Sequence, residues 1–128
     1  MTSDSPQLLL VEEDETLAAI TSFRLELLGY RVSCAGTGEA ALEQVGNSRP
    51  DLMIIDLYLS GIDGLDLINR LRSEDDTAAI PIIVFSIESD LDVVTKAHAA
   101  GANDYLVVPY DPIVLQDKIE RLLETVLV

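Results

Sequence analysis

The sequence predicts an α/β protein whose single domain is built on a doubly wound, mostly parallel sheet. Short apolar runs alternate five times with stretches in which apolar residues recur at helical spacing, and this alternation favours a parallel sheet with helices on both faces. The chain has 128 residues, of which 48% are hydrophobic, as is typical of one domain with a substantial core. We therefore expect one domain over residues 1–128, with a disordered end from Met1 to about Pro6.

The five predicted strands are short, continuous apolar runs. Such runs are typical of strands that are buried on both faces of a sheet. Pro81 is acceptable in the fourth run because proline is tolerated where a strand begins. The predicted strands are residues 7–11, 31–35, 52–55, 80–85 and 105–108.

A helix is predicted after each strand. The expected helices are residues 14–28, 38–45, 64–72, 89–100 and a segment that begins at residue 112. In the first helix, Leu17, Ile20, Leu25 and Leu28 recur with a helical period and form the expected buried stripe. The fourth helix is expected to open at Ser89, which has the spacing of a capping box.

The charge of the chain restricts its direct partners. The formal net charge is −15, and the few basic residues are scattered, with no run that could follow a phosphate backbone. Direct binding of nucleic acid or of an anionic membrane is therefore not expected, whereas a divalent cation is a natural ligand. The basic residues are Arg24, Arg31, Arg49, Arg70, Arg72, Lys96, Lys118 and Arg121.

The single cysteine and the apolar runs bear on the compartment. Cys34 cannot form an internal disulfide, which fits a reducing compartment; its apolar surroundings predict a buried, unreactive thiol. No apolar run approaches the roughly 18 residues of a membrane span, and residues 1–6 lack the features of a signal peptide. A cytoplasmic protein is expected.

Acidic and hydroxyl residues stand where three of the predicted strands end. Glu12 and Glu13 follow the first strand, Asp56 ends the third and Ser86 ends the fourth. Ligands of open parallel sheets bind outside these ends, and close carboxylates repel one another unless a cation such as Mg²⁺ joins them. The alternative is that the acids cap the next helix and lie in solvent, which suits Glu15 better than Asp56, whose charge interrupts an apolar run.

Five segments, in order and over nearly the whole chain, resemble the receiver domain of two-component response regulators. The separations of 43 residues from Glu13 to Asp56, 30 to Ser86 and 22 to Val108 also fit that family. The resemblance implies a flavodoxin-like three-layer sandwich with strand order 2-1-3-4-5 and a phosphorelay signalling module that is not an enzyme. The matching segments are residues 9–14, 50–56, 61–64, 80–84 and 101–106.

The resemblance also implies roles for individual residues. Asp56 matches the aspartate that accepts a phosphoryl group from a histidine kinase or phosphotransfer protein. Glu12 and Glu13 match the acidic pair that holds Mg²⁺ together with Asp56, and the backbone carbonyl of Tyr58 would complete the protein ligands.

Two further matches concern the switch and the output surface. Ser86 matches the hydroxyl residue that binds the phosphoryl group, and Tyr105 matches the aromatic residue that reports the modified state. The face made by the fourth helix, fifth strand and fifth helix is the implied surface for an effector or a second copy. An apolar patch on this face is expected to include Leu91, Val94, Val114 and Leu115.

Three residues depart from the family pattern. Val108 stands where the family has lysine, which removes a fixed positive charge, and no residue near it in the sequence replaces that charge; Lys96 lies a helix away. Glu13 stands where aspartate is usual, and its extra methylene predicts weaker Mg²⁺ binding. Ile87 is bulky where a small residue is preferred and is expected to narrow access to the pocket.

The departures leave alternatives open. Asp56, Ser86 and Tyr105 favour a phosphorylated receiver, whereas Val108, Glu13 and Ile87 favour a degenerate receiver that acts as a phosphorylation-independent interaction domain. A phosphatase-like hydrolase would need a second aspartate at the position of Tyr58. A flavin or nucleotide binder would need a phosphate-binding loop after the first strand, where the acidic residues 12–15 stand instead.

Overall fold

The computed structural model is described here for residues 5–127, so the predicted disorder of Met1–Asp4 lies outside the described residues. The carbonyl of Pro6 accepts the N–H of Arg31 at 3.0 Å. The strands are β1 (Gln7–Val11), β2 (Arg31–Ala35), β3 (Leu52–Asp56), β4 (Ile82–Ser86) and β5 (Asp104–Val107). The helices are α1 (Glu15–Leu27), α2 (Gly38–Asn47), α3 (Gly64–Ser73), α4 (Leu91–Ala100) and α5 (Pro112–Leu127).

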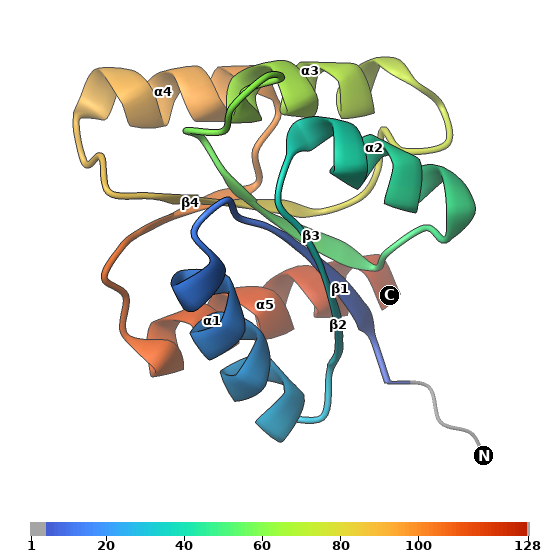
Figure 1. Ribbon diagram of the computed structural model, residues 1–128, viewed down its shortest axis with the longest axis vertical. Helices are drawn as coiled ribbons and strands as arrows, with labels where there is room; N and C mark the ends of the chain where they lie inside the picture. Colours follow the sequence, from blue (N-terminus) through green and yellow to red (C-terminus); the bar gives the residue numbers. More distant parts are fainter. Residues whose placement is uncertain (1–4, 128) are drawn as a thin grey trace.

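The sheet has the predicted topology. All neighbouring strands are parallel, in the order β2-β1-β3-β4-β5. Helices α1 and α5 cover one face, and α2, α3 and α4 cover the other (Figure 1). The doubly wound three-layer architecture is therefore confirmed, and no helix within residues 5–127 is both long and apolar enough to cross a membrane.

The position of the central strands, between two layers of helices, explains why their sequences are apolar without a break. Alternate side chains of β1, β3 and β4 point to opposite faces, and both faces are covered by helices. The side chains that pack towards α2, α3 and α4 include Leu9, Val11, Met53, Ile55, Ile82 and Val84. Those that pack towards α1 and α5 include Leu8, Leu10, Leu52, Ile54, Ile83 and Phe85.

The buried stripe predicted for α1 is wrong in part. Leu25 is buried as expected, but Ile20 is 43% and Leu28 is 45% exposed, while the inward positions are taken by Ala18, Thr21 and Leu25. Thr21 is tolerated there because its hydroxyl lies 2.9 Å from the hydroxyl of Tyr110, so the polar group is satisfied.

Two other local predictions are corrected. Asp90, not Ser89, caps α4, because the Asp90 carboxylate accepts the N–H of Asp92 at 2.9 Å. Cys34 is exposed, not buried, because β2 is an edge strand of the sheet. Partial desolvation nevertheless raises the pKa of the Cys34 thiol, so low reactivity is still expected.

Candidate functional site

Glu12, Asp56 and Ser86 lie together at the carboxyl ends of the three central strands. Glu12 directly follows β1, whereas Asp56 and Ser86 are the last residues of β3 and β4. Because Asp56 is paired in register with Phe85, the residue before Ser86, the acidic and hydroxyl groups meet at the same edge of the sheet. This edge is where an open parallel sheet binds its ligand.

Glu12 and Asp56 form a coupled pair of carboxyl groups. Burial raises the pKa of Glu12 to about 7 from an ordinary value of 4.5; the N–H of Asp14, 3.0 Å from its carboxylate, opposes the rise, and the charge of Asp56 adds to it. Burial also raises the pKa of Asp56, with a further contribution from the charge of Glu13. The pair therefore favours holding one proton, which Glu12 carries, unless a cation neutralises it.

Tyr58 and Ser60 hold the other acidic groups through their backbones. The N–H of Tyr58 donates to Asp56 Oδ1 at 3.1 Å, and the N–H of Ser60 donates to Glu13 Oε1 at 2.8 Å. Glu13 is thus directed to the loop after β3. Within residues 5–127, no three Asp, Glu, His or Cys side chains already converge as a set of metal ligands. The oxygen donors of Glu12 and Asp56 still suit Mg²⁺ chemically, because a cation would relieve their repulsion.

Ser86 and Tyr105 are connected through the loop after β4. Ser86 is 2% exposed, and its hydroxyl oxygen accepts the N–H of Glu88 at 3.0 Å. The hydroxyl of Tyr105 donates to the carbonyl of the same residue, Glu88, at 2.6 Å. Both side chains therefore hold one short segment, a link through backbone atoms that the sequence did not reveal.

Val108 places an apolar side chain where the pocket lacks a cation. It directly follows β5, and its N–H donates to the carbonyl of Ser86 at 2.8 Å. Its half-buried side chain packs against the core beneath α1 and α5. Over the described part of the chain, no ion pair involves Glu12, Glu13 or Asp56. The acidic pocket is therefore not neutralised by a contacting basic side chain.

Ile87 stands beside the pocket and is 75% exposed. Tyr58, which follows Asp56 by two residues, is also exposed, at 55%. Whether Ile87 slows the entry of a phosphodonor stays a prediction, because its side chain extends into solvent.

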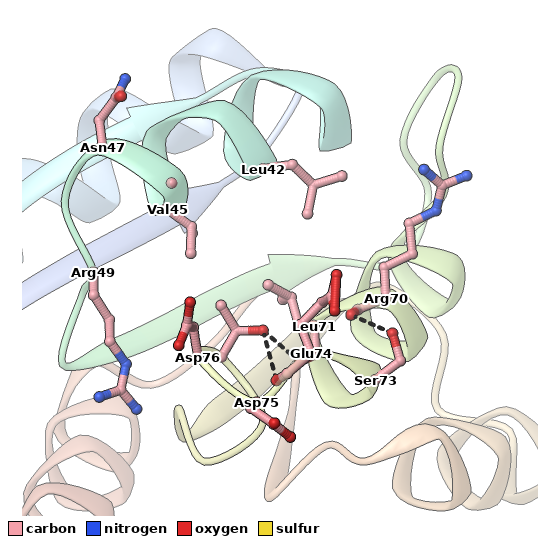
Figure 2. A pocket seen from close by; sticks show the side chains of 12 residues that line it. Leu42, Val45, Asn47, Arg49, Arg70, Leu71, Ser73, Glu74, Asp75 and Asp76 are labelled. Atoms are coloured by element: carbon pink, nitrogen blue, oxygen red, sulfur yellow. Dashed lines mark hydrogen bonds between the residues drawn. The ribbon is translucent and has the colours of Figure 1, made fainter.

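A large hollow lies elsewhere in the molecule. It has a volume of about 1140 Å³ and lies between the carboxyl-terminal ends of α2 and α3 (Figure 2). These helices run antiparallel to the strands, so the hollow is at the opposite end of the sheet from Asp56. None of the predicted site residues lines it. Its lining includes Leu42, Val45, Arg49, Arg70, Leu71 and Asp76.

Comparison with known proteins decides the family. Residues 8–120 match the family model of the response regulator receiver domain. The chain belongs to this family. Receiver domains are phosphoryl-accepting signalling modules of two-component systems, and the chain spans about half the length of the curated relatives it matches.

Individual relatives agree with this assignment. The transcriptional regulatory protein AfsQ1 of Streptomyces coelicolor is 37% identical over 119 residues, which are 92% of this receiver domain and 51% of AfsQ1. The signal receiver domain of a histidine kinase from Syntrophus aciditrophicus has a TM-score of 0.89 at 32% identity, covering 95% of this chain and 92% of that one. The receiver domain of a sensor histidine kinase from Pseudomonas aeruginosa PAO1, crystallised with magnesium coordinated in its active-site cleft, has a TM-score of 0.88 at 26% identity, covering 94% and 99%.

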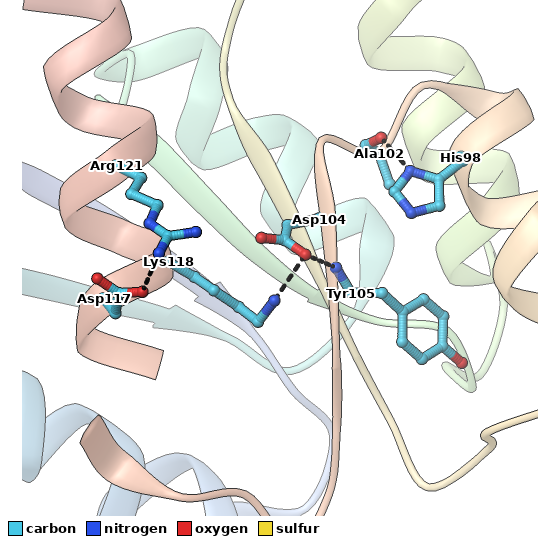
Figure 3. Close-up of polar contacts among 7 residues, drawn as sticks. All are labelled: His98, Ala102, Asp104, Tyr105, Asp117, Lys118 and Arg121. Atoms are coloured by element: carbon cyan, nitrogen blue, oxygen red, sulfur yellow. Dashed lines mark hydrogen bonds and ion pairs between the residues drawn. The ribbon is translucent and has the colours of Figure 1, made fainter. Parts of the chain in front are cut away.

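The α4–β5–α5 face of this receiver domain is partly apolar. Leu91 is 75% exposed and Val114 is 41% exposed, but Leu115 is only 2% exposed and belongs to the core. The predicted patch therefore loses Leu115, keeps Leu91 and Val114 as exposed members, and has Val94 as a half-buried one. On the same face, Lys118 Nζ of α5 lies 2.8 Å from Asp104 Oδ1 of β5, while the Tyr105 ring points away from Lys118 (Figure 3).

A network around Arg72 was missed by sequence reasoning. From the last turn of α3, the guanidinium donates to the carbonyls of Gly101, Ile80 and Ala78 and to the side chain of Asn103 at 2.7–3.0 Å. It ties α3 to the segments before β4 and β5. No local pattern identifies these partners, since three of them are backbone oxygens.

Proposed function

We propose that Asp56 accepts the phosphoryl group of this receiver domain and that Glu12, Glu13 and the carbonyl of Tyr58 hold Mg²⁺ with it. The observation that carries the proposal is the convergence of the half-buried Asp56 with buried Glu12 and buried Ser86 at the ends of neighbouring strands. Mg²⁺, when bound, would neutralise charge between the carboxylates and the phosphoryl oxygens.

The geometry at Asp56 suits nucleophilic attack. The N–H of Tyr58 holds Oδ1, which leaves Oδ2 as the oxygen that forms the new bond to phosphorus. The bond between phosphorus and the donor atom breaks, and the leaving group departs with its electron pair. The backbone of the loop after β3 thus orients the carboxylate for this step.

Ser86 is placed to bind the transferred group. Its oxygen accepts a hydrogen bond from Glu88, so its hydroxyl hydrogen is available for a phosphoryl oxygen. The nearby Ser86 hydroxyl also acts to lower the pKa of Tyr105, against the burial that raises it. Ser86 is therefore a neighbour of Tyr105, the proposed switch residue.

A second candidate is a degenerate receiver that signals without phosphorylation. Val108 favours it, because the side chain is uncharged and packs into the core. In this version the fold presents an interaction surface, and Asp56 is a remnant.

The partners follow from the surface and the charge. We infer that a histidine kinase or phosphotransfer protein acts on Asp56 and that the exposed Leu91, Val107 and Val114 contact a protein effector or a second copy. The net charge of −15 argues against direct contact of residues 1–128 with nucleic acid or membrane, and we propose a cytoplasmic location. Transcriptional regulation, which the names of relatives such as AfsQ1 state, would need a part that these residues do not include.

Phosphorylation by a small donor tests the proposal. The protein is incubated with acetyl phosphate and Mg²⁺ and analysed by intact-mass spectrometry, with Asp56→Asn as the matched control. A phosphoryl adduct on the native chain that is absent from Asp56→Asn supports acceptance at Asp56. An unmodified native chain favours the degenerate receiver.

A further inference from the structure

The acidic pocket needs a positive charge that its own strands do not provide. Glu12, Glu13 and Asp56 contribute three carboxyl groups, and a phosphoryl group would add more negative charge. Val108 supplies neither charge nor a side-chain hydrogen bond at the end of β5. A basic side chain that another element brings to this edge of the sheet could provide the missing charge.

Most basic side chains are engaged elsewhere. Arg31 begins β2 and Arg49 lines the hollow between α2 and α3, so both lie at the opposite end of the strands. The engaged residues are Arg24 with Tyr110, Arg70 with Asp66, Arg72 with backbone carbonyls, Lys118 with Asp104, and Arg121 with Asp117.

Lys96 differs from all of these in its position. It lies on α4, is exposed, and within residues 5–127 its ammonium group has no hydrogen-bond or ion-pair partner. Its side chain lines a hollow of about 570 Å³ together with Glu13, Tyr58 and Ser60. These are the residues that follow β1 and β3 and flank Asp56. Lys96 thus shares a hollow with the residues at the mouth of the acidic pocket.

We propose that Lys96 provides, from α4, the positive charge for the phosphoryl group on Asp56 that Val108 cannot provide. The inference rests on the proposed function of Asp56 and names a further residue that would bind the phosphoryl group. A lysine ammonium on a flexible four-carbon stem suits this role, because it acts as a point charge and does not need the fixed geometry of a guanidinium. In other members of the family the corresponding lysine follows β5. Here the positive charge would come from α4.

The test measures the affinity for beryllofluoride, a phosphoryl mimic, in Mg²⁺ buffer by isothermal titration calorimetry. Lys96→Gln is compared with Arg49→Gln, which removes the same charge from an exposed position at the far end of the sheet. Because Lys96 is exposed and screened, we expect Lys96→Gln to weaken binding about threefold to fivefold. Arg49→Gln should change it less than about twofold.

A rescue variant separates charge from a local structural effect. Adding Val108→Lys to Lys96→Gln restores a cation from β5 and is expected to return the affinity at least to the native value. The deficit of Lys96→Gln should also shrink as salt is raised, since exposed charges are screened. Amide spectra of each variant confirm that it is folded.

The outcomes distinguish the inference from the proposed function. Equal affinities for Lys96→Gln and Arg49→Gln, with binding that still requires Asp56, would overturn the role of Lys96 and leave Asp56 as the acceptor site. Binding that is absent from the native chain, or unchanged in Asp56→Asn, would overturn the proposed function and the role of Lys96 with it.

Discussion

At the ends of β1 and β3, Glu12 and Asp56 are titratable groups held in a buried, coupled arrangement that favours one proton. At the end of β5, Val108 is an uncharged side chain that packs into the core beneath α1 and α5. The first region gives up stability to keep charged groups close together, whereas the second gains stability from apolar packing. The pocket therefore keeps the carboxyl groups that attract a cation but lacks, at the end of β5, a positive charge for a phosphoryl group.

The difference teaches that binding and switching depend on separate parts of the pocket. Under the proposed function, the acidic side determines whether Mg²⁺ and a phosphoryl group bind. Under the same proposal, the β5 side would determine whether binding moves the loop between β5 and α5, because a ligand shifts an equilibrium only through its different affinities for the two states. The proposed contribution of Lys96 is a positive charge from α4, which would not connect the phosphoryl group to β5.

The largest expected effect comes from restoring the lysine. Val108→Lys should bind beryllofluoride roughly 30-fold more tightly, or about 2 kcal/mol, because a partly buried charge pair forms with the phosphoryl mimic. Amide chemical shifts should then change as far as Tyr105 and the loop after β5. In the native chain they should stay within the pocket and the turn of α4 that carries Lys96.

Val107→Lys is the matched control, since it adds the same charge at an exposed neighbour. If beryllofluoride already changes the amide chemical shift of Tyr105 in the native chain, a lysine at position 108 is not needed for the response.

The next effect concerns the stability of the acidic side. The pKa of Glu12 is raised in the folded state to about 7, so its favourable contribution is fully present below its unfolded pKa of about 4.5 and is lost as the pH rises through 7. Glu12→Gln should therefore be more stable than the native chain by about 1–2 kcal/mol at pH 8 without Mg²⁺. The advantage should disappear near pH 4.

Urea unfolding at several pH values measures this difference. Glu43→Gln, at an exposed position of α2, serves as the control and should show no such gain. A loss of stability at pH 8 for Glu12→Gln would contradict the assignment of the proton to Glu12.

The smallest effect concerns Mg²⁺. Glu13→Asp should bind Mg²⁺ about threefold to fivefold more tightly, because the shorter side chain suits a geometry-sensitive ion and gives up the contact with the Ser60 N–H. Titration followed by amide chemical shifts gives both dissociation constants. Equal or weaker binding by Glu13→Asp would mean that the extra methylene is not what limits the site.

The sequence predicted the strand order and the placement of Glu12, Asp56 and Ser86, because their strands are unbroken apolar runs that end in polar residues. It did not predict the inward position of Thr21, whose partner Tyr110 is 89 residues away. Lys96 lies within a predicted helix, far along the sequence from Glu13, yet the fold brings both residues to the same hollow. Contacts of this kind depend on how helices lie over the sheet, which local patterns do not encode.

The contacts of Arg72 have a consequence for the motion of α4. Because its guanidinium holds the carbonyl of Gly101, the carboxyl-terminal end of α4 is anchored to α3. The other end begins at Leu91, which is 75% exposed. Helix α4 is thus held at its carboxyl-terminal end, and its amino-terminal end lacks this anchor. If the segment around Glu88 moves, we expect the displacement of α4 to be largest at Leu91, on the surface proposed to contact an effector.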